Sequence, residues 1–146
     1  MYVRQIAGGM TKAVTDGAWS ERYPVWSPDS RTIAFELKKD DATNVAVVAA
    51  SGGAPRPLTT APGESWPYGW SPDGDKIVFA ALRAGLWNLW WVSVTSGESR
   101  QLTRNASANT FVRYPAWSPK GDRIAYELGT VTGNIWIAQL PSAPGE

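Results

Sequence analysis

The sequence contains no cysteine and no histidine, and each absence excludes several kinds of chemistry. Without cysteine the chain forms no disulfide, no thiolate metal site and no cysteine nucleophile. Without histidine it lacks the commonest general base, the commonest metal ligand and the Ser-His-Asp triad. Methionine and phenylalanine are also scarce, with 2 and 3 residues. We therefore expect a protein that is not an enzyme and that uses no cofactor and no metal.

Neither sign of charge dominates, because 14 lysines and arginines are interleaved with 13 aspartates and glutamates. Nothing resembles the basic stripe of a protein that follows a phosphate backbone, so we expect no binding of nucleic acid. The longest apolar-rich run, Leu86 to Val94, is interrupted by polar residues and is too short to span a membrane. The N-terminal ten residues contain no apolar core of signal-peptide length. These features predict a soluble chain without membrane insertion.

Tryptophan, proline and glycine are abundant, with 9, 11 and 14 residues among 146. Proline and glycine in such numbers indicate short strands separated by many turns. Large flat side chains suit the layers between such strands. The sequence contains no phosphate-binding loop, no dinucleotide-binding fingerprint and no Gly-x-Ser-x-Gly nucleophile elbow. The composition is typical of an all-β protein.

One motif recurs three times along the chain. Trp-Ser-Pro followed by Asp or Lys begins at Trp26, Trp70 and Trp117, at spacings of 44 and 47 residues. Each copy continues through a polar turn into a short apolar run, and a second strand-like run then begins with asparagine. A glycine turn with a Leu-Thr ending closes two of the units. Four strand-like segments, a to d, in a repeat of this length describe one blade of a β-propeller.

The residues of the motif predict a tight turn between strands a and b. Proline presets φ near −65°, the aspartate caps the turn through its side chain, and Gly74 or Gly121 supplies a position with φ > 0. Ser30 takes the place of that glycine in the first copy, so we expect its turn to be strained or of another type. Asp29 and Asp73 are accordingly interpreted as turn caps rather than as a catalytic pair.

The repeats resemble those of the TolB-type, WD-like β-propellers. That pattern is Pro-x-Trp-Ser-Pro-Asp-Gly-x-x-Ile-x-Phe, followed by an Ile-Tyr/Trp-Val strand and a Gly-x-x-x-x-Leu-Thr ending. The segments Pro24 to Phe35, Tyr68 to Phe79 and Pro115 to Tyr126 carry the likeness. The resemblance implies an all-β fold of propeller blades, each with four antiparallel strands, and about three blades in this chain. It also implies a periplasmic protein if the chain is processed as TolB is, and a cytoplasmic one otherwise.

Alignment on the repeat divides the chain into propeller repeats and a tail. The expected parts are residues 1–15 (strands c and d of a partial blade), 16–59 and 60–103 (two whole blades), 104–140 (a blade without strand d) and 141–146 (the tail). Trp26, Trp70 and Trp117 are expected to pack between blades, and Trp90 and Trp136 to lie in the core of strand c.

About three blades are too few to close a ring, which typically takes four to eight. Two arrangements solve this problem. Either the chain is a portion of a longer propeller, or two copies form a homodimer with six blades. In the homodimer, Lys12 to Val14 of a second copy would complete the last blade by β-augmentation.

The candidate binding residues belong to one face and the channel of the disc, where strand a begins and the d-to-a and b-to-c loops meet. They are Trp19, Arg22, Tyr23, Trp66, Arg83, Trp87, Arg113 and Tyr114. Arg22, Trp66 and Arg113 lie at equivalent repeat positions, and an aromatic ring between two guanidinium groups suits a carboxylate or an extended peptide. The alternative is that both arginines form salt bridges between blades with Glu21 and Glu64.

Residues and resemblance together favour a non-catalytic module that binds a protein or peptide at this rim and channel. The alternative is a gating or structural propeller segment of a larger enzyme, such as a prolyl-oligopeptidase-type peptidase. An intrinsic lyase or hydrolase is disfavoured, because related enzymes would rely on histidine ligands or bases and this chain has none.

Overall fold

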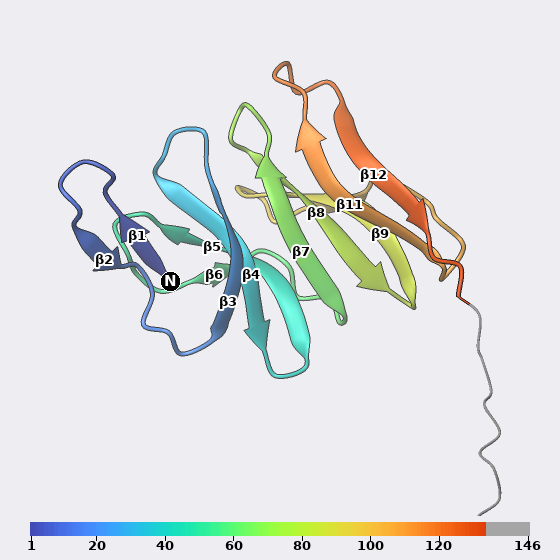
Figure 1. The fold of residues 1–146 in the computed structure, drawn as a ribbon, viewed down its shortest axis with the longest axis horizontal. Coiled ribbons are helices and arrows are strands. Elements are labelled where there is room, and N and C mark those ends of the chain that lie inside the picture. The colour runs from blue at the N-terminus through green and yellow to red at the C-terminus, as the bar shows by residue number, and fades with distance from the viewer. Residues whose placement is uncertain (134–146) are drawn as a thin grey trace, which may run out of the picture.

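The computed structural model describes residues 1–133, which form twelve strands in four antiparallel sheets. The strands are β1 (Tyr2–Arg4), β2 (Thr11–Ala13), β3 (Ser20–Trp26), β4 (Thr32–Lys39), β5 (Ala42–Ala49), β6 (Arg56–Pro57), β7 (Glu64–Trp70), β8 (Lys76–Arg83), β9 (Leu86–Ser93), β10 (Ser99–Gln101), β11 (Thr110–Trp117) and β12 (Ile124–Thr130). Figure 1 shows the sheets side by side in chain order, from the β1–β2 hairpin at one end to β11 and β12 at the other.

Two sheets are whole blades. β3 to β6 pair in the order of the sequence, and so do β7 to β10, which is the predicted arrangement of strands a to d. β1 and β2 form the partial blade before them, and β11 and β12 are strands a and b of the blade after them. The predicted all-β fold of about three propeller blades is therefore confirmed. The expected strand c from Ile135 to Leu140 and the tail at 141–146 lie outside the described residues.

The turn between strands a and b is built as the motif predicts. Asp29 accepts hydrogen bonds from the Ser27 hydroxyl at 2.6 Å and from the Arg31 amide at 3.0 Å. The hydroxyl bond, the larger influence, holds the pKa of Asp29 below its usual value. The third copy has a lysine in place of this aspartate, and there Asp122 accepts from the Ser118 hydroxyl at 2.7 Å instead.

Ser30 adopts the same turn as its glycine counterparts and is strained rather than differently folded. Its φ is 59°, close to the 75° of Gly74 and the 73° of Gly121. Its amide donates to the Ser27 carbonyl at 3.0 Å, as the Gly74 amide donates to Ser71 at 2.9 Å. Of the two expectations for this turn, strain is therefore the correct one, because a side chain at φ > 0 crowds the backbone.

Both faces of the middle strands of the first whole blade, β4 and β5, are buried, because side chains alternate along each strand. Ile33, Phe35 and Leu37 pack toward the β1–β2 hairpin with Val14, Ala46 and Val48. The intervening Ala34 and the β5 residues Val45 and Val47 pack toward the next blade, with Trp70, Ile77 and Phe79. Each blade thus supplies a wall for the core of the blade beside it, as stacked repeats require.

The repeated tryptophans differ in burial. Trp70 is 9% exposed, and its Nε1 donates across the seam to the Val25 carbonyl of the preceding blade at 3.0 Å. Trp26 is 46% exposed, so the expectation that it packs between blades is wrong. The reason is its position at the start of the first whole blade. The hairpin before it contains only strands c and d, so no strand a faces Trp26 as β3 faces Trp70.

Candidate functional site

The first strands of neighbouring sheets, β3, β7 and β11, contact one another in chain order along the inner edge of the arc. Each of these strands contains an irregularity in its pairing with the next strand. The register shifts between Arg22 and Val25, between Pro67 and Gly69, and between Arg113 and Ala116. A bulge bends the strand and re-aims its side chains. The three bulges fall at equivalent positions of the repeat, just before the tryptophan of each Trp-Ser-Pro motif.

Two tyrosines in these bulges have strained backbones. Tyr23 has φ 52° and Tyr114 has φ 51°, a region that bulky residues rarely enter. Both side chains are exposed, at 56% and 64%. The middle blade inverts the dipeptide, with Pro67-Tyr68 where the other two have Tyr-Pro. Strained residues of this kind cluster at binding sites, at a cost of about 1–3 kcal/mol each.

The aromatic groove is a cavity of about 300 Å³ lined by Tyr23, Trp66, Tyr68, Arg113 and Tyr114. Tyr68 meets Tyr114 edge to face, with ring centroids 5.9 Å apart. Burial, the largest influence, raises the pKa of the Tyr68 phenol, so the hydroxyl keeps its proton and remains a donor. The groove therefore offers several ring faces and one guanidinium group.

Two further aromatic rings support the side chains of the groove from behind. Trp87 on β9 packs against Trp66 with ring centroids 4.3 Å apart. The Arg113 guanidinium lies over the Phe111 ring, 4.4 Å from its centroid. These contacts restrict the rotamers of Trp66 and Arg113, which lowers the entropy lost when a ligand binds.

The charged pocket adjoins the groove and has a volume of about 200 Å³. Its lining residues are Arg22, Tyr23, Glu36, Lys38, Asp41, Thr43, Glu64 and Trp66. Tyr23 and Trp66 line both cavities and form the wall between them. The pocket thus places three carboxylates and two basic side chains beside aromatic faces.

Glu36 is the buried charge of this pocket, with 2% of its surface exposed. Among residues 1–133 its carboxylate accepts no hydrogen bond and forms no ion pair. Desolvation, the largest influence, raises the pKa of Glu36, and the positive charge of Arg22 opposes that effect. Arg22 is its cross-strand partner on β3. The two side chains nevertheless do not meet as an ion pair.

The structure brings five of the eight predicted residues together: Arg22, Tyr23, Trp66, Arg113 and Tyr114. Trp87 supports Trp66 and lines neither cavity. Trp19 lies apart, with the Lys39 ammonium 4.8 Å from its ring centroid. Arg83 donates to the Glu64 carbonyl at 2.7 Å and to the Ser65 hydroxyl at 2.6 Å, so its guanidinium anchors the start of β7.

The alternative role of the rim arginines, salt bridges with Glu21 and Glu64, is not formed in the described range. Glu21 accepts hydrogen bonds from the Met1 amine at 2.5 Å and from the Thr15 hydroxyl at 2.7 Å. The ion pairs found between residues 1 and 133 do not include Arg22, Arg113 or Glu64. Both rim arginines are consequently without an acidic partner in this part of the chain.

Sequence reasoning missed Glu36 and Tyr68. Tyr68 departs from the repeat, and Glu36 stands where the three copies differ in charge, so a signal was available for each. Glu36 aligns with Ala80, which is fully buried in the apolar core, and with Glu127, which is exposed. Tyr68 aligns with the prolines Pro24 and Pro115. Comparing the three copies position by position would have singled out both residues.

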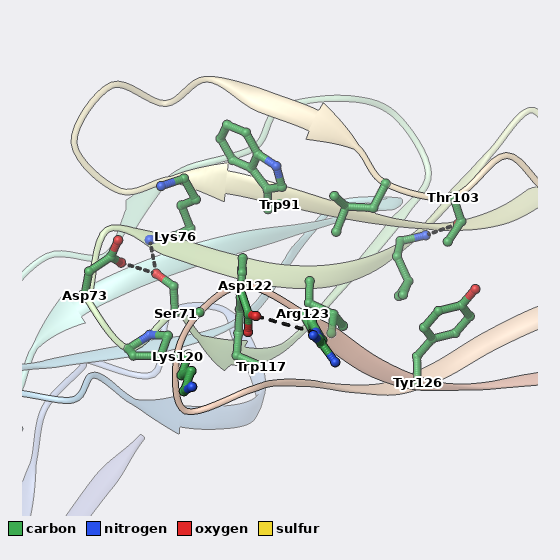
Figure 2. Close-up of a pocket in the computed structure, with 15 residues that line it drawn as sticks. Ser71, Asp73, Lys76, Trp91, Thr103, Trp117, Lys120, Asp122, Arg123 and Tyr126 are labelled. Carbon is green, nitrogen blue, oxygen red and sulfur yellow. Dashed lines mark hydrogen bonds and ion pairs between the residues drawn. The ribbon is translucent and has the colours of Figure 1, made fainter.

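A larger cavity, about 560 Å³, lies elsewhere in the described residues, between the second whole blade and β11–β12. Figure 2 shows its lining, with Ser71, Asp73 and Lys76 facing Lys120, Asp122 and Arg123. A cavity of about 440 Å³ recurs at the same repeat positions between the two whole blades. We therefore interpret both cavities as the ordinary seam between neighbouring blades. The described part of the chain has no acidic cluster suited to a metal ion and no helix that could cross a membrane.

Solved structures with the same architecture include TolB proteins and a hydrolase. A protein assigned as TolB from Agrobacterium tumefaciens matches with a TM-score of 0.71 and 21% identity, over 91% of this chain and 55% of its own. TolB from Acinetobacter baumannii matches with a TM-score of 0.70 and 20% identity, over 86% of this chain and 31% of its own. A puromycin hydrolase matches with a TM-score of 0.63 and 24% identity, over 82% of this chain and 20% of its own. The chain thus spans about half the length of the first and less than a third of the others.

No curated protein matches the chain. The model of the family described as the TolB beta propeller domain matches residues 1–143. That match covers the three Trp-Ser-Pro motifs, both whole blades and the two partial ones. The chain therefore belongs to the TolB beta-propeller domain family.

Proposed function

We propose that this chain is a non-catalytic module that binds an extended segment of a peptide or protein along the inner edge of its blades. The observation that carries the proposal is the aromatic groove. Two equivalent blades hold Tyr23 and Tyr114 in strained conformations that the fold does not require, since Pro67 replaces them in the middle blade. Both tyrosines face one cavity together with Trp66. Strain maintained at two symmetric positions indicates selection for what the side chains contact.

The chemistry of the groove suits a peptide. Tyrosine, tryptophan and arginine are the residues that dominate binding energy at protein interfaces. Ring faces pack on apolar or proline-rich segments, and the planar Arg113 guanidinium matches a carboxylate or a backbone carbonyl. Catalysis is disfavoured by the absence of histidine and cysteine and by the role of Asp29 and Asp73 as turn caps.

Replacing Tyr114 with glycine is expected to weaken peptide binding at least tenfold while leaving the melting temperature unchanged or higher. Glycine removes the ring from the groove and also relieves the strain at φ 51°. The probe is a peptide enriched from a random library on the wild-type chain, with affinity measured by fluorescence anisotropy. The matched control is Trp26→Ala, which removes an exposed aromatic ring of β3 outside the groove and should bind normally. Unchanged binding by Tyr114→Gly would overturn the proposal.

A second candidate is a gating or structural propeller segment of a peptidase. The likeness to the puromycin hydrolase favours it, because this chain matches a fifth of that protein. The two candidates differ in what the gene encodes beyond these residues. A reading frame that continues into a hydrolase domain supports the second candidate, and one that ends without such a domain supports the first.

Ring closure by a second copy remains a proposal of ours for the isolated chain. The β1–β2 hairpin, at one end of the row of sheets (Figure 1), exposes the side chains of Tyr2 and Met10, at 74% and 71%. Blades stack on neighbours to bury such surface. We expect sedimentation at micromolar concentration to report twice the 15.8 kDa chain mass, and Tyr2→Asp to shift the mass toward the monomer. A monomeric wild type contradicts this arrangement.

A further inference from the structure

Glu36 has a property that the fold does not explain. The residue is only 2% exposed and its carboxylate, which lines the charged pocket, lacks a partner in the described residues, although burial disfavours an unpaired charge. The equivalent position in the next blade is Ala80, buried in the core with Leu89 and Val112. The fold therefore accommodates a small apolar residue at this position. The glutamate lowers the stability of the folded state without being required for the blade to form.

The surroundings of Glu36 select the sign of a ligand group. Glu64 of β7 and Asp41 of the β4–β5 turn add two carboxylates, against Arg22 of β3 and Lys38 of β4. Acidic groups are therefore in excess. Lys38, Asp41 and Arg22 are exposed to solvent, which screens their charges, whereas Glu36 lies deeper and its charge is screened less. The pocket as a whole attracts a cation.

The walls of the pocket are suited to the same kind of group. Tyr23 and Trp66 line the pocket together with the carboxylates. The faces of tyrosine and tryptophan rings attract cations, most strongly where water is excluded. Carboxylates together with aromatic faces are the combination that binds alkylammonium groups.

We propose that the charged pocket binds the alkylammonium group of a lysine side chain, with Glu36 as its counter-ion. This rests on the proposed function, because the rest of the peptide lies in the adjoining aromatic groove. The shared walls, Tyr23 and Trp66, place the lysine next to residues whose side chains enter the groove. Arg113 at the other side of the groove then faces a carbonyl or carboxylate of the same peptide.

The test compares two synthetic peptides, acetyl-Tyr-Lys-Tyr-Gly-amide and the analogue with norleucine, which has the same chain without the ammonium group. Titration calorimetry at low salt should show that the wild type binds the lysine peptide at least tenfold more tightly. Glu36→Gln, which keeps the shape of the side chain, should bind both peptides with the affinity of the norleucine peptide. The matched control, Glu127→Gln, changes the exposed glutamate at the equivalent repeat position and should retain the preference.

A folding readout accompanies the titration. Since burial raises the pKa of Glu36, its charged form is disfavoured in the folded state. Glu36→Gln should therefore melt at a temperature no lower than the wild type at pH 7, so a lost preference reports binding. Equal affinity of the wild type for the two peptides contradicts the proposed lysine-binding pocket but is consistent with peptide binding in the aromatic groove. Failure of both peptides to bind overturns the proposed function together with this inference.

Discussion

Replacing Trp70 with alanine is expected to lower the free energy of unfolding by about 3–5 kcal/mol, the usual cost of removing a buried aromatic side chain. Trp70 lies in the core between the two whole blades, and its Nε1 bonds the Val25 carbonyl across the seam at 3.0 Å. Its removal leaves a cavity at that seam and one unpaired carbonyl. For a domain with a stability of about 5–15 kcal/mol, this loss is severe.

The same substitution at Trp26 provides the control. Trp26 begins the same Trp-Ser-Pro motif but is 46% exposed, so Trp26→Ala should cost about 1 kcal/mol or less. Urea unfolding followed by circular dichroism measures both variants, and Trp70→Phe separates the loss of the hydrogen bond from most of the loss of packing. Similar losses for Trp70→Ala and Trp26→Ala would show that the motif stabilises its own turn rather than the contact between blades.

Gly63→Ala is expected to destabilise the protein by about 2–5 kcal/mol, combining a side chain at φ > 0 with overpacking. The φ of Gly63 is +96°, and a Cβ there would clash with the Leu82 carbonyl oxygen, a backbone atom of β8. The Gly63 carbonyl also accepts from the Thr43 amide at 3.3 Å. Because Thr43 and Glu64 line the charged pocket, the shift should also weaken binding of the lysine peptide.

Gly85 is the matched control for the steric part of this effect. Its φ is +77°, and a Cβ there would meet nothing within 4 Å. Gly85→Ala should therefore cost only the conformational part, about 1–2 kcal/mol. Thermal unfolding of both variants tests the comparison. If Gly63→Ala were no worse than Gly85→Ala, the close approach of the Gly63 loop to β8 would not constrain the fold.

The repeat predicts those residues of the candidate site that occupy equivalent positions in successive blades. Arg22, Trp66 and Arg113 occupy the same repeat position, so stacking of blades brings them to one edge of the arc whatever the details of each strand. The repeat also predicts a rim position for Arg83 and Trp87, which belong to a b-to-c loop. The direction of a side chain depends on local contacts, and these turn Arg83 onto the β7 backbone and Trp87 behind Trp66.

By itself, the sequence determined the class of fold, the number of blades and the order of strands within each blade. These follow from local turn chemistry and from the spacing of the Trp-Ser-Pro motifs, which any chain with this repeat must share. It also excluded chemistry based on cysteine and histidine. The same spacing predicts the edge that we propose as the binding site.

Only the tertiary structure decided which side chains face a cavity and which are covered. The bulges that strain Tyr23 and Tyr114 arise from pairing between strands, and the burial of Glu36 arises from the next blade packing against β4. The different burial of Trp26 and Trp70 likewise depends on whether a neighbouring first strand is present. The bulges depend on pairing between the strands of one blade and the burial depends on contacts between blades, and the residues of a single strand specify neither.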